Sequence, residues 1–93
     1  MDKGEKKGNV MLKDYTRKYN MFNGHGWIYE FENGYGASVI KHDASYGGKM
    51  GLYEIAVLDS KGDFCYTTDI TDDVVGYASE ETVYETLDRI KSL

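Results

Sequence analysis

The chain has 93 residues, of which 41% are hydrophobic, and its formal net charge at pH 7 is −5. This length fits one domain that can just bury a core of its own, and no apolar run is long enough for a signal peptide or a transmembrane helix. We therefore expect a soluble protein of the cytoplasm. Its one cysteine, Cys65, excludes an internal disulfide, and neither His25 nor His42 has a His or Cys partner at the spacing of metal ligands.

The two halves of the chain carry opposite charge. Residues 1–50 contain 8 Lys or Arg and 6 Asp or Glu, a net of +2, whereas residues 51–93 contain 3 and 10, a net of −7. An acidic body repels the phosphates of nucleic acids, and the basic residues near the N-terminus are too few to argue for such binding. Nucleic acid is therefore not an expected partner.

The N-terminal part predicts a tail followed by a helix. Residues 1–9 have no apolar residue after Met1 and are typical of a disordered tail, which leaves residues 10–93 as a single α+β domain. From Val10, apolar side chains recur at helical spacing, and Asn23-Gly24 can end a helix; the apolar positions are Leu12, Tyr15, Tyr19 and Phe22. We predict an amphipathic helix over residues 10–22, with a strand as the alternative.

Two turn signals organise the middle of the chain into a sheet. Asn33-Gly34 predicts a type I′ hairpin with a two-residue loop, and Ser60-Lys61-Gly62 predicts a second hairpin in which Gly62 takes the left-handed conformation. The connections are too short for parallel crossovers, so we predict a four-stranded antiparallel meander paired in chain order. Its strands are expected near residues 27–32, 35–42, 52–59 and 63–68, and the glycine-rich residues 43–51 are expected to form a mobile loop.

The predicted registers assign side chains to the two faces of this sheet. In the first hairpin Glu32 opposes Tyr35, which puts these residues on one face: Trp27, Tyr29 and Phe31 with Gly36, Ser38 and Ile40. In the second hairpin one face holds Ala56, Leu58, Phe64 and Tyr66, and the other holds Tyr53, Ile55, Val57 and Cys65, the last as a small core residue. Neither face is polar, and one helix covers only one side. The other side therefore needs a cover, which is the N-terminal helix, a second copy of the chain or a partner.

The residues after the sheet match two patterns. Thr71 can cap a short helix that has Asp72 and Asp73 in its first turn and ends at Gly76. The same stretch matches the first, third, fifth and twelfth places of a calcium-binding loop, which are Asp69, Thr71, Asp73 and Glu80. Val74 stands where that loop requires glycine, so we expect helix caps and no metal.

The C-terminal residues predict a helix near residues 79–92. Ser79 can cap it, and Glu80 and Glu81 lie in its positively polarised first turn. An apolar stripe follows at helical spacing, formed by Val83, Leu87 and Ile90. We expect this stripe to pack the helix on one face of the sheet.

No pattern in the sequence predicts catalysis. Residues 45–51 offer backbone donors and a lysine but lack the full spacing of a phosphate-binding loop. Cys65, His42 and Asp43 are the residue types of a thiol triad, without a local signature that supports their convergence. We therefore expect neither enzymatic activity nor a cofactor.

Tyrosine and acidic residues are the strongest indication of a binding surface. The chain has nine tyrosines, and tyrosine supplies contact area with little loss of entropy while keeping a polar tip. The alternative is that the tyrosines fill a small core and its rim. The residues expected to contact a partner are Tyr35, Tyr53, Tyr66, Asp72, Asp73, Glu80, Glu81 and Glu85.

Four stretches carry a resemblance to a known group of proteins. FENGYGASV, SYGG, GLYEIAVLD and ITDDVVGY, followed by a short acidic helix, resemble small acidic proteins encoded by tailed bacteriophages and prophages. The resemblance covers roughly residues 31–93, and no activity, ligand or catalytic residue comes with it. It implies a bacterial cytoplasm during infection, where short acidic phage proteins bind host proteins.

The leading expectation is thus an accessory protein of phage type that binds a host protein, such as a defence or nucleic-acid enzyme, through an acidic and tyrosine-bearing surface. The alternatives are a homodimeric accessory or structural protein and a small-molecule or nucleotide binder that uses residues 43–51. Neither a membrane nor a nucleic acid is an expected partner. Residues 10–22 precede the resemblance, which favours a second copy over the N-terminal helix as the cover of the second sheet face.

Overall fold

The computed structural model describes residues 12–21 and 23–93, and the predicted tail at residues 1–9 lies outside them. Within the described residues the strands are β1 (Arg17–Met21), β2 (Gly24–Glu30), β3 (Gly36–Lys41), β4 (Tyr53–Leu58) and β5 (Val75–Ala78). A short 3₁₀ helix, η2 (Gly48–Met50), follows β3, and the helix α1 (Glu80–Lys91) follows β5.

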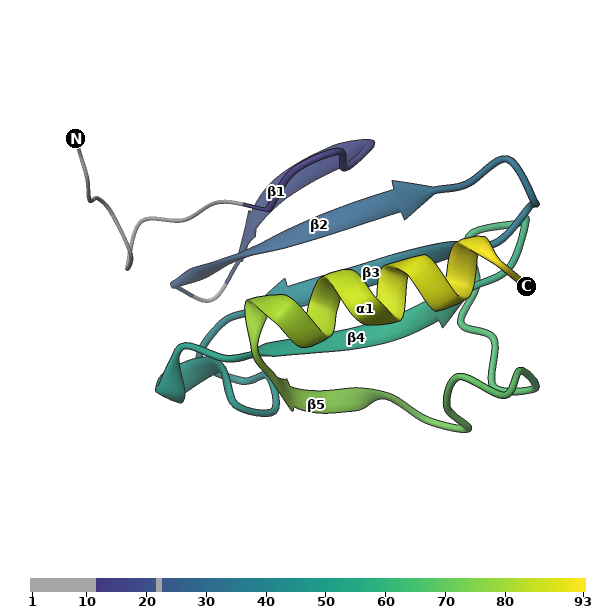
Figure 1. Cartoon of the computed structure of the whole chain (residues 1–93). Coiled ribbons are helices and arrows are strands. Elements are labelled where there is room, and N and C mark those ends of the chain that lie inside the picture. The colour runs from purple at the N-terminus through teal and green to yellow at the C-terminus, as the bar shows by residue number, and fades with distance from the viewer. Residues whose placement is uncertain (1–11, 22) are drawn as a thin grey trace, which may run out of the picture.

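The strands form one antiparallel sheet in the order β1-β2-β3-β4-β5, and α1 lies along one face of it, over β3 and β4 (Figure 1). The α+β class, the antiparallel pairing in chain order and the helix on one face are therefore confirmed. The sheet has five strands among the described residues, where we predicted four. None of the helices in this part of the chain is both long and apolar enough to cross a membrane.

The predicted N-terminal helix is wrong where the chain is described. Residues 17–21 form β1, an edge strand in which Arg17 lies opposite Ile28 of β2 and Met21 lies opposite Gly24. Asn23 has a φ of 61°, so the residues expected to end a helix instead turn the chain back as a hairpin. Pairing with β2 satisfies backbone groups along a whole strand, and this tertiary gain outweighs a local helical periodicity.

The first central hairpin has a three-residue loop, one residue longer than predicted. The backbone N–H of Phe31 donates to the carbonyl oxygen of Tyr35 at 2.9 Å, and Gly34 has a φ of 91° whereas Asn33 does not adopt positive φ. The register therefore shifts by one residue relative to the prediction, which puts Tyr29 opposite Ala37. Since one step reverses every side chain, the predicted assignment of faces in this hairpin is wrong. Gly36, Ser38 and Ile40 lie on the face opposite to Trp27 and Tyr29.

The predicted fourth strand, residues 63–68, is reduced to a single bridge between Leu58 and Phe64. The turn before it forms as expected, with Gly62 at a φ of 83° and the N–H of Asp59 donating to the carbonyl oxygen of Asp63 at 2.8 Å. Beyond the bridge, the N–H of Ile70 donates to the Thr68 hydroxyl oxygen at 3.2 Å, which closes a local turn. Side-chain bonds of this kind compete with a sheet ladder, and the remaining edge of β4 is free to pair with β5.

The short helix predicted after Thr71 is also absent from the described residues. The Thr71 hydroxyl oxygen accepts the N–H of Asp73 at 3.1 Å, two residues along the chain, as in a turn and not in a helix cap. Gly76, expected to end that helix, lies inside β5. The Thr71 hydroxyl therefore stabilises a turn, as Thr side chains often do outside helices, and does not cap a helix.

The core lies between α1 and the sheet face beneath it. The predicted faces of the second hairpin are confirmed for β4, because Tyr53, Ile55 and Val57 point toward α1. Ser79 accepts the N–H of Thr82 at 3.1 Å and caps α1 as predicted. The residues buried together are Leu12, Trp27, Tyr29, Ala37, Val39, Tyr53, Ile55, Val57, Ala78, Val83, Leu87 and Ile90, which include the whole predicted stripe of the helix.

The chain before β1 is tied to this same side of the sheet. Leu12 is buried in the core, the N–H of Lys13 donates to the Tyr84 hydroxyl at 2.8 Å, and the Tyr29 hydroxyl donates to the carbonyl oxygen of Lys13 at 2.7 Å. Residues 12–16 therefore close the core next to α1. They do not cover the second face of the sheet, which was one of the expected roles of this segment.

Candidate functional site

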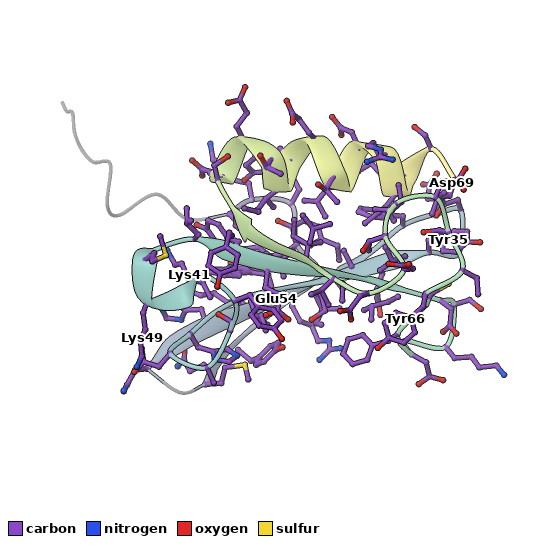
Figure 2. All side chains as sticks on the ribbon, turned by 90° about the horizontal axis from the view of Figure 1, so that it is seen from below. Tyr35, Lys41, Lys49, Glu54, Tyr66 and Asp69 are labelled. Carbon is purple, nitrogen blue, oxygen red and sulfur yellow. The ribbon has the colours of Figure 1, made fainter. Side chains whose placement is uncertain are left out.

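The second face of the sheet, on the side away from α1, is not covered by any helix or strand of residues 12–21 and 23–93. Figure 2 shows Glu54 and Tyr66 on this side, with α1 on the other. We call this surface the open face. It is formed by alternate residues of four strands and by the bridge segment after β4: Arg17, Tyr19, Met21, Ile28, Glu30, Ser38, Ile40, Glu54, Ala56, Leu58, Phe64 and Tyr66.

Part of the open face is formed by small residues, whose side chains project little above the backbone of the sheet. Gly26 lies directly opposite Tyr19, and a Cβ atom on Gly26 would overlap the Tyr19 ring. The Tyr19 ring therefore lies flat against β2. The same row continues across the sheet through Ile40 to Glu54. A neighbouring row runs from Arg17 through Ile28 and Ser38 to Ala56.

Beside β4 the open face rises to an aromatic ridge. Phe64 and Tyr66 are 58% and 48% exposed, and their ring centroids lie 6.3 Å apart. Phe64 faces Leu58 across the isolated bridge, which brings the ridge next to the sheet although the strand pairing ends there. Exposure of large aromatic rings to water is unfavourable in free energy, and burial against a partner removes this cost.

Next to Leu58 the open face has a groove of about 560 Å³. It lies between the tip of the β2–β3 hairpin and the turn at residues 59–62, and the charged residues of its walls are Arg17, Glu30, Asp59 and Lys61. Ile28 and Leu58 form part of its apolar floor. The groove thus offers apolar contact area and charges of both signs.

The loop at residues 43–51 closes the opposite end of the open face. The N–H of Tyr46 donates to Glu54 Oε1 at 2.8 Å, and the Tyr46 ring stacks on Tyr77 with centroids 6.4 Å apart. Gly76 is required beneath Tyr46, since a Cβ atom there would overlap the Tyr46 side chain. The groove of about 560 Å³ and a second one of about 310 Å³ lie at the hairpin end and are not lined by this loop.

The excess negative charge is placed away from the open face. Exposed carboxylates lie on the outer side of α1 and in the segment before β5: Asp69, Asp72, Asp73, Glu81, Glu85 and Asp88. Figure 2 places Asp69 near the end of α1. The open face instead carries Arg17 and Lys61 against Glu30, Glu54 and Asp59, so it holds charges of both signs with only one carboxylate in excess.

The structure does not bring the predicted partner residues into one surface. Tyr66 lies on the open face, whereas Tyr53 is 5% exposed beneath α1, where burial and the carboxylate of Glu80 raise the pKa of its phenol. Tyr35 is half-buried against the core, at the end of the molecule near Asp69 (Figure 2). The acidic members belong to the opposite side and to an edge: Glu80, Glu81 and Glu85 lie on α1, and Asp72 and Asp73 precede β5.

Sequence reasoning missed several side chains of the open face. Tyr19 was assigned to a helix, and its alternation with Arg17 and Met21 in β1 is the strand signal that identifies it. Ile28 and Ile40 share this face, which requires the one-residue shift of the first hairpin. Phe64 and Ala56 were assigned correctly to the face of Tyr66.

The described residues hold no group of three or more His, Cys, Asp or Glu side chains that could bind a metal ion. The His42 Nδ1 accepts the N–H of Ala44 at 3.0 Å within a turn, and the Sγ of the half-buried Cys65 lies 3.5 Å from the Thr67 hydroxyl. A His25 ring nitrogen lies 2.9 Å from Asn20 Oδ1, and burial with the nearby charges of Lys18 and Lys41 lowers the pKa of that imidazole. These contacts explain each side chain locally.

Comparison of the chain with protein-family models finds no match, and neither does comparison with curated proteins or with solved structures. The argument for a function therefore rests on the geometry of the open face.

Proposed function

We propose that this protein acts by binding another protein chain through the open face, as a phage-type accessory protein that has no catalytic chemistry of its own. The observation that carries the proposal is an aromatic ridge, Phe64 and Tyr66, beside a groove of mixed polar and apolar lining, on a sheet face that no helix or strand of the described residues covers. A small domain rarely leaves such a surface to water, and aromatic side chains are enriched where protein chains meet.

The chemistry of the open face favours a protein over other partners. A nucleic acid needs a surface with an excess of Lys and Arg, whereas Arg17 and Lys61 are outnumbered here by Glu30, Glu54 and Asp59. A small molecule needs an enclosing cavity with converging polar groups, whereas this groove is open and opposes charges of both signs. Flat apolar area with a polar rim is the usual composition of a protein interface.

The acidic side of the molecule has a supporting role in this proposal. Glu81, Glu85 and Asp88 lie on the outer side of α1, where long-range attraction would speed the approach of a basic partner without fixing how it docks. In the setting implied by the resemblance to phage proteins, that partner is a host protein. The carboxylates then attract such a basic partner, whichever protein chain occupies the open face.

Photo-crosslinking in living bacteria tests the proposal without knowledge of the partner. A photoreactive phenylalanine analogue replaces Tyr66 in one variant and Glu85, on the outer side of α1, in a matched control. We expect discrete protein adducts from position 66 that position 85 does not give. If position 66 yields no adduct, or the same diffuse products as position 85, the open face is not a binding surface. Circular dichroism of both variants establishes that each one is folded.

A further inference from the structure

We propose that the open face binds a second copy of this chain, about a two-fold axis that runs along β3. The inference rests on the proposed function, because it names the chain that occupies the same face. It follows from three properties of that face: its symmetry about β3, the match between its ridge and its groove, and the distribution of its charges.

The layout of the open face is suited to a two-fold axis. β3 is the central strand of the sheet, with β1 at one edge and the bridge segment of Phe64 and Tyr66 along the other side of β4. Two sheets that pack face to face keep their strands within about 30° of each other. A two-fold axis along β3 then stacks β3 on β3, β2 on β4 of the second copy, and β1 on the Phe64–Tyr66 segment of the second copy.

This arrangement brings the raised part of one copy onto the hollow part of the other. The ridge of Phe64 and Tyr66 lies on the β4 side, whereas the groove extends from the turn at residues 59–62 toward β1 and β2, where Arg17 and Glu30 form its wall. The axis therefore places each ridge over the groove wall of the opposite copy, and it does so twice. Ile28 of one copy lies over the row of Ala56 in the second copy, where Ala56 itself is only 5% exposed within its own chain.

The same axis brings opposite charges on the open faces of the two copies toward each other. Arg17 lies on β1 and Glu54 on β4, on opposite sides of β3, and the Arg17 side chain has no hydrogen bond or ion pair with the described residues. The axis turns Arg17 of one copy toward Glu54 and the Tyr66 ring of the other. An arginine can pair with a carboxylate and stack on an aromatic ring at once.

The net charge of −5 does not oppose this association, because most of the excess carboxylates lie outside the open face. Six exposed carboxylates lie on α1 and in the segment before β5, which face outward in the stacked pair: Asp69, Asp72, Asp73, Glu81, Glu85 and Asp88. At physiological ionic strength, charges more than about 8 Å apart are largely screened. The dimer therefore has an interior in which opposite charges face each other, and two acidic outer surfaces.

Light scattering coupled to size exclusion, on the full chain at about 50 μM, tests the inference. We expect a mass of twice 10.6 kDa for the parent protein. Ile28→Asp and Tyr66→Asp should give the single mass, since each puts a charge into the interface, while the control Glu85→Lys on α1 should stay dimeric. Arg17→Glu should raise the dissociation constant at least tenfold, and Arg17→Lys should largely preserve the dimer. Circular dichroism melts identify any variant that fails to fold.

The outcomes separate this inference from the proposed function. A monomeric parent protein overturns the dimer, and discrete adducts from position 66 would then still support binding of a different protein. A monomeric parent without adducts overturns both. A dimer that withstands Ile28→Asp and Tyr66→Asp but dissociates with Glu85→Lys is built on the helix side, which also overturns the inference.

Discussion

The side-chain amide of Asn33, at the tip of the β2–β3 hairpin, donates hydrogen bonds to the carbonyl oxygen of Ile90 at 2.9 Å and to that of Lys91 at 3.0 Å. Its Oδ1 accepts the N–H of Tyr35 at 3.0 Å. One residue therefore closes the hairpin and caps the last carbonyl groups of α1, of which that of Ile90 also accepts the N–H of Leu93 at 3.2 Å. The hairpin loop and the helix are locked to each other across 57 residues of sequence.

Removal of the Asn33 amide should destabilise the protein by about 1 to 2 kcal/mol, because a hydrogen bond contributes about 1 kcal/mol net and the carbonyl oxygen of Lys91 and the N–H of Tyr35 both lose their bond to Asn33. Asn33→Asp should cost at least as much as Asn33→Ala. A carboxylate cannot donate to Ile90, and it places negative charge at the negative end of the helix dipole. Urea melts of both variants measure this, with the exposed neighbour Glu32→Ala as the control. Equal stability of Asn33→Ala and the parent would show that the cap does not matter.

The same contact explains a part of the fold that the sequence could not predict. An Asn-Gly pair by itself favours a two-residue turn. Here the Asn33 side chain instead donates to the carbonyl oxygen of Ile90, a residue too distant in the sequence for a local pattern to reveal. The one-residue shift then reverses the faces of the first hairpin. Turns and caps built from neighbouring residues were predictable, as at Gly62 and Ser79.

The errors at both edges of the sheet have a related origin. Tyr15 and Tyr19 have a spacing that fits a helix, yet an unpaired edge of β2 favours a strand there, and that edge is a tertiary property. The other edge strand, β5, has only four residues. It overlaps the end of the short helix that was predicted after Thr71. The candidate site reaches from β1 to the bridge segment after β4. Its two rings after β4, Phe64 and Tyr66, were predictable, and its β1 residues were not.

Truncation of the helix stripe should be costly. Leu87→Ala and Ile90→Ala should each lower the free energy of unfolding by about 2 to 4 kcal/mol, because both side chains are buried against the sheet and each truncation leaves a cavity. Ser79→Ala should cost about 1 kcal/mol through loss of the bond to the N–H of Thr82. Urea denaturation decides this, with Glu85→Ala on the exposed side of α1 as the matched control. A Leu87→Ala variant that melts like the parent would mean that the stripe does not dock the helix.

Stability should fall as the pH rises above 10, because of buried phenols. Burial raises the pKa of Tyr29 and of Tyr53 above the ordinary value of 10.0, so the folded state binds more protons than the unfolded state at alkaline pH. Their contribution is complete below pH 10 and is lost as the pH rises toward the raised values, at about 1.4 kcal/mol per pH unit for each phenol.

Tyr29→Phe separates the two effects of that hydroxyl. The variant should be less stable at pH 7 by about 1 kcal/mol, because the carbonyl oxygen of Lys13 loses its donor. Above pH 10 its stability should decline less steeply than that of the parent, because one titrating group is gone. Chemical denaturation at pH 7, 10 and 11, followed by circular dichroism, measures both. Parallel pH curves for the variant and the parent would contradict the assignment to Tyr29.

Substitution by alanine should change the free energy of unfolding by different amounts at two glycines of the open face. A Cβ atom at Gly26 meets the far end of the Tyr19 ring, whereas one at Gly36 meets the backbone carbonyl oxygen of Tyr29. The Tyr19 ring is 37% exposed and can swing outward, but the carbonyl of Tyr29 is fixed in the sheet. Gly26→Ala should therefore change stability by less than about 1 kcal/mol, since reduced freedom of the unfolded chain offsets the contact.

Gly36→Ala should cost about 1 to 3 kcal/mol, as overpacking does when the backbone has to move. The pair also tests the open face, because Gly26→Ala lifts the Tyr19 ring off β2 and roughens a surface that must lie flat on its partner. We expect Gly26→Ala to weaken the dimer severalfold in sedimentation equilibrium while its urea midpoint stays near that of the parent. A Gly26→Ala protein that loses stability as Gly36→Ala does would show that Tyr19 is held in place, and that β1 is a rigid part of the sheet.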